Sequence, residues 1–158
     1  MHYLVSAIIE KLQLELSTAV AASQQARDSA THSENIAANK YDTLAVEAAY
    51  LAHGQSIRIA ELKQSIALYQ HFQRPTFNAH ATIQLGALVC IEDDQGQQRR
   101  LLIGPAAGGL SIVSEQGPIQ IITPSAPLGQ ALIGKHVDDE VDWQTNQRKE
   151  SFSIVAIE

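Results

Sequence analysis

The chain has 158 residues, which suits one domain or one domain with an appendage. Hydrophobic residues make up 45% of the chain and aromatic residues only 5%, so its cores must rest on leucine, isoleucine, valine and alanine. The net charge of −6 argues against a protein that wraps nucleic acid by neutralising phosphates. It leaves open a protein that approaches a basic channel or a metal ion.

The charge is unevenly distributed along the chain. Residues 1–74 carry six Lys/Arg and seven Asp/Glu, whereas residues 75–158 carry five Lys/Arg and ten Asp/Glu. Two halves with different charge suggest two working surfaces. No stretch approaches the roughly 20 apolar residues of a membrane span, and the N-terminus has no basic-then-apolar signal segment. We therefore predict a soluble cytoplasmic protein with no membrane partner.

The chain contains a single cysteine, Cys90, so no internal disulfide can form. Cys90 lies in the apolar run Leu88-Val89-Cys90-Ile91. We predict that it is a small buried hydrophobic residue and not a nucleophile.

Residues 2–73 contain one glycine, Gly54, and no proline, which favours long helices. Apolar residues in the first part recur near the helical period, at Leu4, Ile8, Leu12, Leu16, Ala19 and Ala26. In the second part they recur at spacings of three and four, with one polar break, at Leu44, Ala48, Leu51, Gln55, Ile59, Leu62, Ile66 and Tyr69. Because each helix has one apolar stripe, each needs a partner, and we predict an antiparallel helical hairpin.

The turn of this hairpin is expected near residues 29–34, which are polar and rich in side chains that compete for backbone hydrogen bonds. Thr31 or Ser33 could cap the second helix, and Thr31 with Glu34 has the form of a capping box. About 28 helical residues would give an arm of about 40 Å. The turn would then lie far from the rest of the protein.

The pattern changes at Arg74-Pro75, because proline disfavours helix at the residue before it. We predict a helical hairpin over residues 1–74 and a second domain over residues 75–158. In the second domain Asp93–Gly96 reads as a turn and 104–109 as a loop. Strands are predicted at 82–91, 100–103, 119–123, 137–143 and 152–157, and a short helix at 125–132, with Ser125 as N-cap and Gly134 just after its end. The predicted fold class is α+β, with an antiparallel sheet and one helix against it.

Residues 123–143 resemble the signature of the Gre transcript cleavage factors. The signature runs Ser-Pro-Leu-Gly-x-Ala-Leu-x-Gly-Lys-x-x-Gly-Asp-x-Val, and it is matched here at Pro127, Leu128, Gly129, Ala131, Leu132, Gly134, Lys135, Asp139 and Val141. Ser125 stands one position early, and Asp138 stands where the family has glycine. The run Ile154–Glu158 is similar to the family's last strand, and Ser33-Glu34-Asn35 resembles its Asp-Leu-Ser-Glu-Asn hairpin tip.

The resemblance implies a coiled-coil finger joined to a domain like the FK506-binding proteins but without their isomerase role. It implies a monomeric bacterial factor that binds core RNA polymerase at the rim of its secondary channel. Ser125, Pro127, Leu128 and Gly129 would form the docking loop. The finger would enter the channel, where its tip acids help to hold a Mg²⁺ of the polymerase. The free protein would have no metal or other cofactor of its own and would not be an enzyme.

The tip departs from the family's pattern. Thr31 occupies the position of the family's aspartate and His32 that of its leucine, so Glu34 is the one matched acid. Asp28 and Asp42 are the nearest replacements, and we take Glu34 and Asp28 as candidate tip acids. Cleavage stimulation and polymerase binding without cleavage both stay open, as does contact of the tip with nascent RNA. A coiled-coil adaptor unrelated to transcription and a metal-dependent hydrolase are the rival functions.

Overall fold

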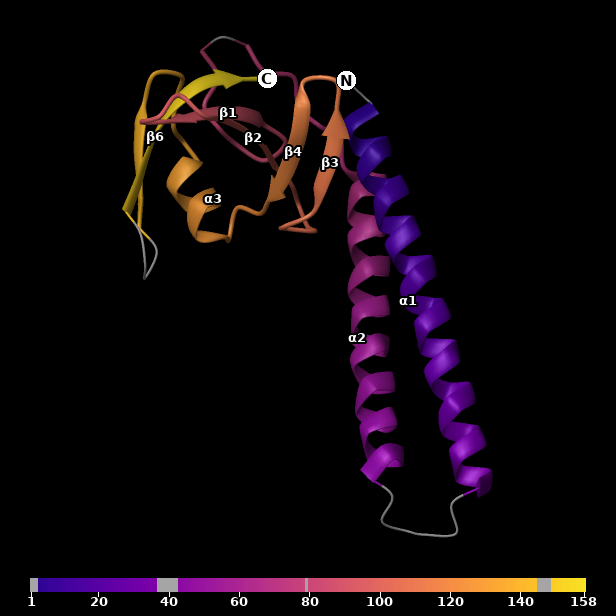
Figure 1. The fold of residues 1–158 in the computed structure, drawn as a ribbon. Coiled ribbons are helices and arrows are strands. Elements are labelled where there is room, and N and C mark those ends of the chain that lie inside the picture. The colour runs from indigo at the N-terminus through magenta and orange to yellow at the C-terminus, as the bar shows by residue number, and fades with distance from the viewer. Residues whose placement is uncertain (1–2, 37–42, 79, 145–148) are drawn as a thin grey trace. The chain divides into compact units, whose positions relative to one another are not determined.

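The computed structural model describes residues 3–36, 43–78, 80–144 and 149–158 of the chain (Figure 1). The chain divides into two compact units, Met1–Gln70 and His71–Glu158. The first consists of two long helices, and the second holds a β-sheet with one short helix. Over the described residues, no helix combines the length and the apolar character that crossing a membrane requires.

Helix α1 spans Tyr3–Ile36 and helix α2 spans Thr43–His71. They lie side by side (Figure 1), and Arg58 of α2 lies 2.8 Å from the Glu15 carboxylate of α1. The predicted stripe of α1 is confirmed: Leu4, Ile8 and Leu12 are buried, and Leu16, Ala19 and Ala26 are half-buried. Ser23, which the sequence did not single out, is also buried.

The inward stripe of α2 differs from the prediction at one position among the described side chains, and the predicted Leu44 side chain lies outside them. Leu51 is 57% exposed, and Ala52 is half-buried in its place. Counting back from Gln55 by three residues and then four gives Ala52 and Ala48, which keeps the spacing of the seam regular. The observed stripe alternates spacings of four and three along its whole length, through Ala48, Ala52, Gln55, Ile59, Leu62, Ile66 and Tyr69.

The predicted turn at residues 29–34 is wrong, because α1 continues through Thr31 and Glu34 to Ile36. The Thr31 hydroxyl donates a 2.9 Å hydrogen bond to the Arg27 carbonyl, four residues back. A threonine that bonds in this way is tolerated inside a helix. Thr31 therefore does not cap α2, and the residues between α1 and α2 lie outside the described part of the chain.

Gly54 lies in the interior of α2, and no atom lies within 4 Å of a Cβ built there. We therefore expect Gly54→Ala to raise the stability of the hairpin by about 1 kcal/mol, the difference in helix propensity between the two residues. Thermal unfolding followed by circular dichroism at the helix band measures the change. Ala60→Gly, at an exposed position of the same helix, should lower stability by a similar amount. A less stable Gly54→Ala variant would contradict the expectation.

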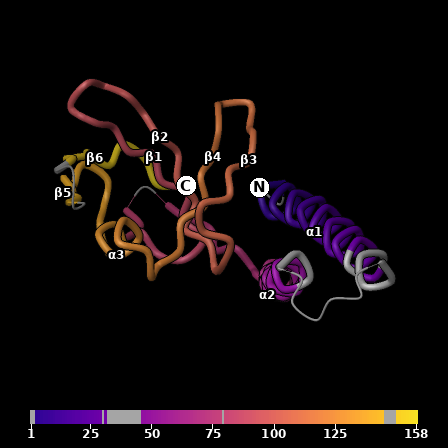
Figure 2. Tube along the Cα trace, turned by 60° about the horizontal axis from the view of Figure 1, so that its bottom comes forward, coloured from indigo at the N-terminus to yellow at the C-terminus, as the bar shows by residue number. Residues whose placement is uncertain are grey.

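The second unit contains a six-stranded sheet in the order β3-β4-β2-β1-β6-β5 (Figure 1). Helix α3 is next to β5 in both views (Figures 1 and 2). The elements are β1 Leu88–Asp93, β2 Gln98–Ile103, β3 Ser111–Ser114, β4 Gly117–Ile122, α3 Pro127–Leu132, β5 Glu140–Gln144 and β6 Lys149–Ile157. The predicted turn at Asp93–Gly96 joins β1 to β2, and the predicted loop 104–109 precedes β3.

The sheet is mixed and not purely antiparallel as predicted. Strands β2 and β4 pair in parallel, with Leu102 opposite Ile121, whereas the other pairs are antiparallel. The strand β3, which was not predicted, accounts for the difference. It pairs antiparallel with β4 and so lets the chain reverse twice between β2 and β4. The predicted strand at 82–91 is also displaced, because β1 begins only at Leu88.

The main core cluster of this unit lies on one face of the sheet and includes α3, and Leu88, Leu102, Ile119 and Ile121 are buried outside that cluster. Side chains of β1 and β2 alternate, so every second residue points to this face, whereas a register shift between β1 and β6 interrupts the alternation in β6. The buried cluster consists of Ile83, Ala87, Val89, Ile91, Leu101, Ile103, Ile122, Leu128, Leu132, Val141, Phe152, Ile154 and Ile157. This packing fixes α3 and the loop before it against the sheet.

Candidate functional site

The N-cap residue of α3 differs from the one predicted. Ala126 is the N-cap residue, without a side-chain hydrogen bond, and Pro127 occupies the first helical turn. Proline fits there because its fixed φ suits the helix and its missing N–H would have no partner in the helix. Ser125 lies one residue before the cap, where its carbonyl accepts a 3.0 Å hydrogen bond from Gln130 Nε2. The Ser125 hydroxyl lies 3.2 Å from that of Thr123.

Gly129 allows α3 to lie directly on the preceding loop. A Cβ built at Gly129 would lie 2.1 Å from the backbone oxygen of Thr123. That oxygen also accepts a 3.0 Å hydrogen bond from the Ala126 N–H, which closes the loop. Leu128 is 9% exposed and belongs to the buried core. Leu128 and Gly129 are therefore buried residues that hold α3 and the preceding loop in position.

The outer surface of α3 is formed by other residues. Ser125, Pro127 and Gln130 are exposed, and Ile133, just past the helix, is 39% exposed. We name these four residues the α3 surface. Of the predicted docking residues, Ser125 and Pro127 can be contacted directly by a partner. Gln130 and Ile133 were not among the predicted docking residues, although their three-residue spacing from Pro127 was a usable signal.

The segment after α3 returns to the sheet through two unusual backbone conformations. Gly134 follows the helix end as predicted, with φ of 80°, and its N–H donates to the Ile83 carbonyl at 2.8 Å. Asp138 has φ of 71°, a left-handed conformation that glycine adopts most easily. The glycine that the family has at this position therefore has a structural explanation. Asp139 Oδ2 accepts a 2.8 Å hydrogen bond from the His136 N–H and steadies the same turn.

The two candidate tip acids both belong to α1. Asp28 is exposed on the helix, and Glu34 lies in its last turns. Six residues along a helix correspond to about 9 Å of rise and about 120° of difference in direction. The helix therefore does not bring positions 28 and 34 onto one face. Asp42 lies outside the described residues, and within the described part of the chain no three His, Cys, Asp or Glu residues gather as a metal site.

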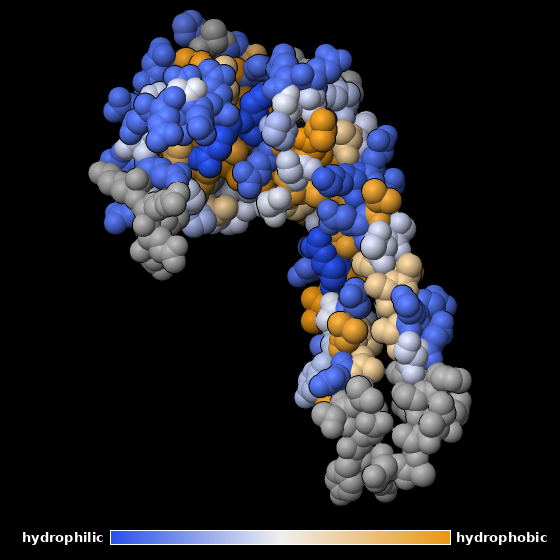
Figure 3. All heavy atoms as spheres, viewed as in Figure 1, coloured by the Kyte–Doolittle hydropathy of each residue, from blue (hydrophilic) through white to orange (hydrophobic). Residues whose placement is uncertain are grey.

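A second apolar stripe runs along α2 on the side away from its inward stripe. Val46, Tyr50 and Ile57 are spaced by about one helical turn or two, and they are 54%, 75% and 50% exposed. The space-filling view shows apolar side chains among polar ones on the hairpin (Figure 3). Such a stripe is unusual on a helix in water, and it gives the hairpin a surface that can contact another molecule.

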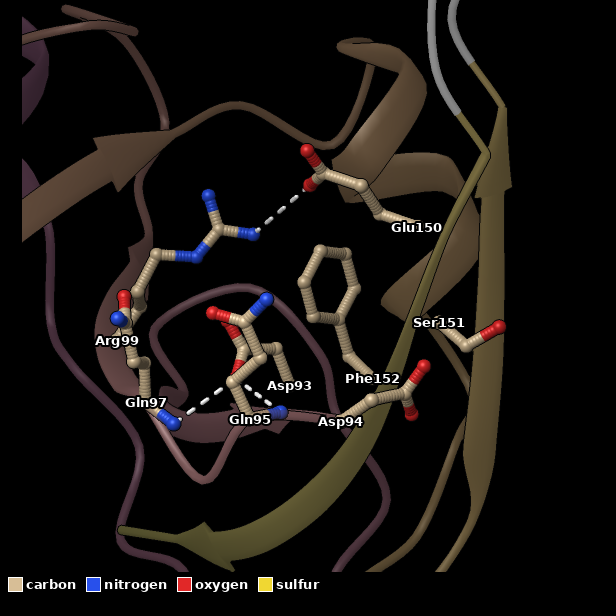
Figure 4. A pocket seen from close by; sticks show the side chains of 8 residues that line it. All are labelled: Asp93, Asp94, Gln95, Gln97, Arg99, Glu150, Ser151 and Phe152. Atoms are coloured by element: carbon tan, nitrogen blue, oxygen red, sulfur yellow. Dashed lines mark hydrogen bonds and ion pairs between the residues drawn. The ribbon is translucent and has the colours of Figure 1, made fainter.

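The sheet carries a hollow of about 600 Å³ between the β1–β2 turn and β6 (Figure 4). The Arg99 guanidinium lies over the Phe152 ring, 4.6 Å from its centroid, and 3.6 Å from the Glu150 carboxylate. Asp93 Oδ1 accepts hydrogen bonds of 2.9 Å from the backbone N–H groups of Gln95 and Gln97, which fix the turn. No pattern in the sequence indicated this arrangement.

Cys90 is half-buried in β1, less enclosed than predicted. Its Sγ lies 3.6 Å from the side-chain oxygen of Gln98. Burial raises the pKa of the thiol, against the opposing effect of the Arg100 charge. A raised pKa keeps the thiolate scarce at neutral pH, so Cys90 does not have the properties of a catalytic nucleophile.

A helical hairpin followed by a small mixed sheet, with a Pro-Leu-Gly helix packed on it, defines a two-part α+β factor. Residues 78–158, more than half of the chain, match the family model of the C-terminal domain of the transcription elongation factors GreA/GreB. The chain belongs to the GreA/GreB family.

Similar proteins include the transcription elongation factor GreA of Jannaschia sp. (strain CCS1), 32% identical over 102 residues. That match covers 63% of this chain, and the chain spans only 60% of the length of that relative. Among solved structures, the GreA factor homolog 1 (Gfh1) of Thermus thermophilus is 21% identical, with a TM-score of 0.39, over 95% of this chain and 94% of that chain. The GreA/GreB factor of Nitrosomonas europaea is 17% identical, with a TM-score of 0.38, over 61% and 78%.

Proposed function

We propose that this chain is a cytoplasmic regulator of transcript elongation that binds core RNA polymerase at the rim of the secondary channel. The observation that carries the proposal is the family match over residues 78–158, which contain α3 and the sheet beneath it. The α3 surface supports it, because Ser125, Pro127, Gln130 and Ile133 offer polar and apolar groups to a partner. The partner supplies the catalytic centre, so the chain acts as a regulator and not as an enzyme.

The hairpin suits a role inside a narrow channel. At 1.5 Å per residue, the 34 residues of α1 extend over about 50 Å. The exposed stripe of Val46, Tyr50 and Ile57 gives α2 apolar groups for contact with a channel wall. The candidate tip acids Asp28 and Glu34 lie toward the C-terminal end of α1. Any contact with nascent RNA would be made at the same end.

The chemistry at the tip would be the delivery of a carboxylate to a Mg²⁺ held by the polymerase. Mg²⁺ takes hard oxygen ligands, and a second metal ion promotes phosphodiester hydrolysis by stabilising charge on the reacting oxygens. Asp28 is exposed and fits such a role. Thr31 fits it poorly, because its hydroxyl is neutral and is bonded to the Arg27 carbonyl inside the helix.

The state of Thr31 favours a second candidate function, in which the chain occupies the polymerase without strong cleavage. A single acid at the tip would give weaker metal binding than an acid pair. The chain would then compete with other factors for the channel. Both functions require association with the polymerase, so a pull-down that recovers no core polymerase would exclude both and favour the coiled-coil adaptor.

Thr31→Asp separates the two candidates. Positions 31 and 34 are neighbours on one helix face, so the substitution would create a pair of acids. We expect it to raise the rate of transcript cleavage in stalled, backtracked elongation complexes about tenfold, the effect of about 1.4 kcal/mol of added metal stabilisation. Thr31→Asn, which has a similar size without the charge, should leave the rate unchanged.

Removal of the matched acid gives the complementary measurement. Glu34→Ala in the Thr31→Asp background leaves one acid at these two positions and should return the cleavage rate to about the wild-type level, and Asp28→Ala tests the other candidate acid. If Thr31→Asp binds polymerase as the wild type does and leaves cleavage unchanged, the acid-pair explanation of the tip is wrong.

A further inference from the structure

The side chain of Gln130 connects α3 to the loop that precedes it. Its Nε2 donates a 3.0 Å hydrogen bond to the Ser125 carbonyl, five residues earlier in the chain. The backbone N–H of Gln130 donates to the Ala126 carbonyl at 2.9 Å. Gln130 therefore bonds to two successive carbonyls at the start of the helix, and it holds the exposed Ser125 beside α3.

The orientation of the Gln130 amide follows from this side-chain bond. An amide group donates through its nitrogen and accepts through its oxygen, whereas a backbone carbonyl can only accept. Because Nε2 faces the Ser125 carbonyl, Oε1 points to another side of the amide group. Gln130 is exposed, and within the described part of the chain no donor is bonded to Oε1. The side chain thus offers an oriented hydrogen-bond acceptor at the surface.

Gln130 lies in the middle of the α3 surface. Pro127 lies three residues before it and Ile133 three residues after it, and both side chains are exposed. Residues at this spacing are neighbours on one side of a helix. A partner that covers the two apolar side chains would exclude water from the amide between them. Contacts that are shielded from water in this way contribute most of the affinity of an interface.

We propose that Gln130 determines the affinity of docking by accepting, through Oε1, a hydrogen bond from a donor group of core RNA polymerase. This inference rests on the proposed function, which takes core polymerase as the partner of the α3 surface. One N–H of Nε2 is already bonded within the chain, so Oε1 is the unbonded end of the amide. A donor that is buried without an acceptor costs free energy, so the loss of Oε1 should weaken binding.

Three variants of the full-length chain separate the two ends of the amide. Gln130→Met keeps the length of the side chain without a strong donor or acceptor, and we expect its affinity for core polymerase to fall about tenfold in an equilibrium binding titration. Gln130→Lys can still donate to the Ser125 carbonyl but has no acceptor, so it should lose at least as much. Gln130→Glu keeps the acceptor oxygen without the donor, and it should lose less than Gln130→Met.

Gln116→Met is the matched control, because Gln116 is an exposed amide between β3 and β4 and does not belong to the α3 surface. It should bind polymerase as the wild type does. The unfolding temperature of every variant, followed by the fluorescence of Trp143, should stay close to that of the wild type. Wild-type affinity of Gln130→Lys would show that only the support of Ser125 matters, and it would overturn the proposal. Wild-type affinity of Gln130→Met, or a Gln130→Glu variant that binds no better than Gln130→Met, would do the same. If the wild type itself does not bind polymerase, the proposed function has failed and not this contact alone.

Discussion

Gly129→Ala is expected to destabilise the C-terminal unit by about 4 kcal/mol, more than most single substitutions do. The added Cβ would lie 2.1 Å from the Thr123 oxygen and 3.0 Å from the Thr123 carbonyl carbon. These are backbone atoms, so no side chain can rotate to make room. The hydrogen bond from the Ala126 N–H to the same oxygen also holds the loop in place.

The fluorescence of Trp143, the single tryptophan, reports on this unit alone. A loss of this size corresponds to a fall of about 20 °C in the unfolding temperature for a unit of this length. Gly108→Ala is the matched control, because its Cβ would meet Thr123 only at 3.4 Å or more, an ordinary contact. Equal unfolding temperatures of the two variants would show that the loop moves away from α3 at little cost.

Arg74→Ala is expected to cost about 3 kcal/mol in the same unit. Arg74 Nε donates a 2.6 Å hydrogen bond to the Gly86 carbonyl, and Nη2 donates to the backbone oxygen of Glu158. The guanidinium also lies over the Phe77 ring at 5.7 Å. Hydrogen bonds from a charged donor contribute about 1.5–3 kcal/mol each, and truncation leaves both carbonyls without this partner.

Arg74→Lys tests whether charge or shape matters at this position. An ammonium group keeps the charge but cannot reach two carbonyls with a planar fork, so about half of the loss should remain. Urea unfolding followed by Trp143 fluorescence gives both values. If Arg74→Ala unfolds at the same urea concentration as the wild type, the arginine contributes no net stability to the unit.

The helical hairpin was largely predictable because its apolar residues recur at regular intervals in the sequence. Leucines and isoleucines at helical spacing determine which face of α1 is inward, and the absence of proline allows the length. The error at Leu51 arose because size was given priority over spacing. Ala52 keeps the seam regular, and a leucine can remain exposed at modest cost. The turn was placed too early because Thr31 satisfies its hydroxyl within the helix, so a polar run is not by itself a helix end.

The sheet was less predictable, and the reason is long-range pairing. The turn chemistry around Gly96 placed the β1–β2 hairpin correctly, since it acts locally. The parallel pairing of β2 with β4 depends on β3, a strand of four residues whose pattern is too short to detect. Ser125 was assigned as cap because a serine suits that role, but Pro127 sets the first turn and so moves the cap to Ala126.

In the candidate site, too, the local motif was predictable from the sequence and the long-range contacts were not. The motif around Pro127 located α3 in the chain, but only the packed structure shows that Leu128 and Gly129 are internal while Gln130 and Ile133 face outward. The contact of Arg99 with Phe152 and Glu150 joins residues of β2 and β6, which are distant in sequence. None of the three residues carries a local signal of the others, so the hollow of Figure 4 could not be predicted.

The place of β6 in the sheet has a consequence for synthesis on the ribosome. Strand β6 lies between β1 and β5 and pairs with both, so neither neighbour is complete until residues 149–157 have been made. The contacts within each helix of the hairpin are local and form early, whereas pairing across the length of a domain is slow. The nascent C-terminal unit therefore leaves the edge of β1 unpaired until β6 has been made, and an unpaired edge beside exposed apolar side chains makes an incomplete fold prone to aggregate.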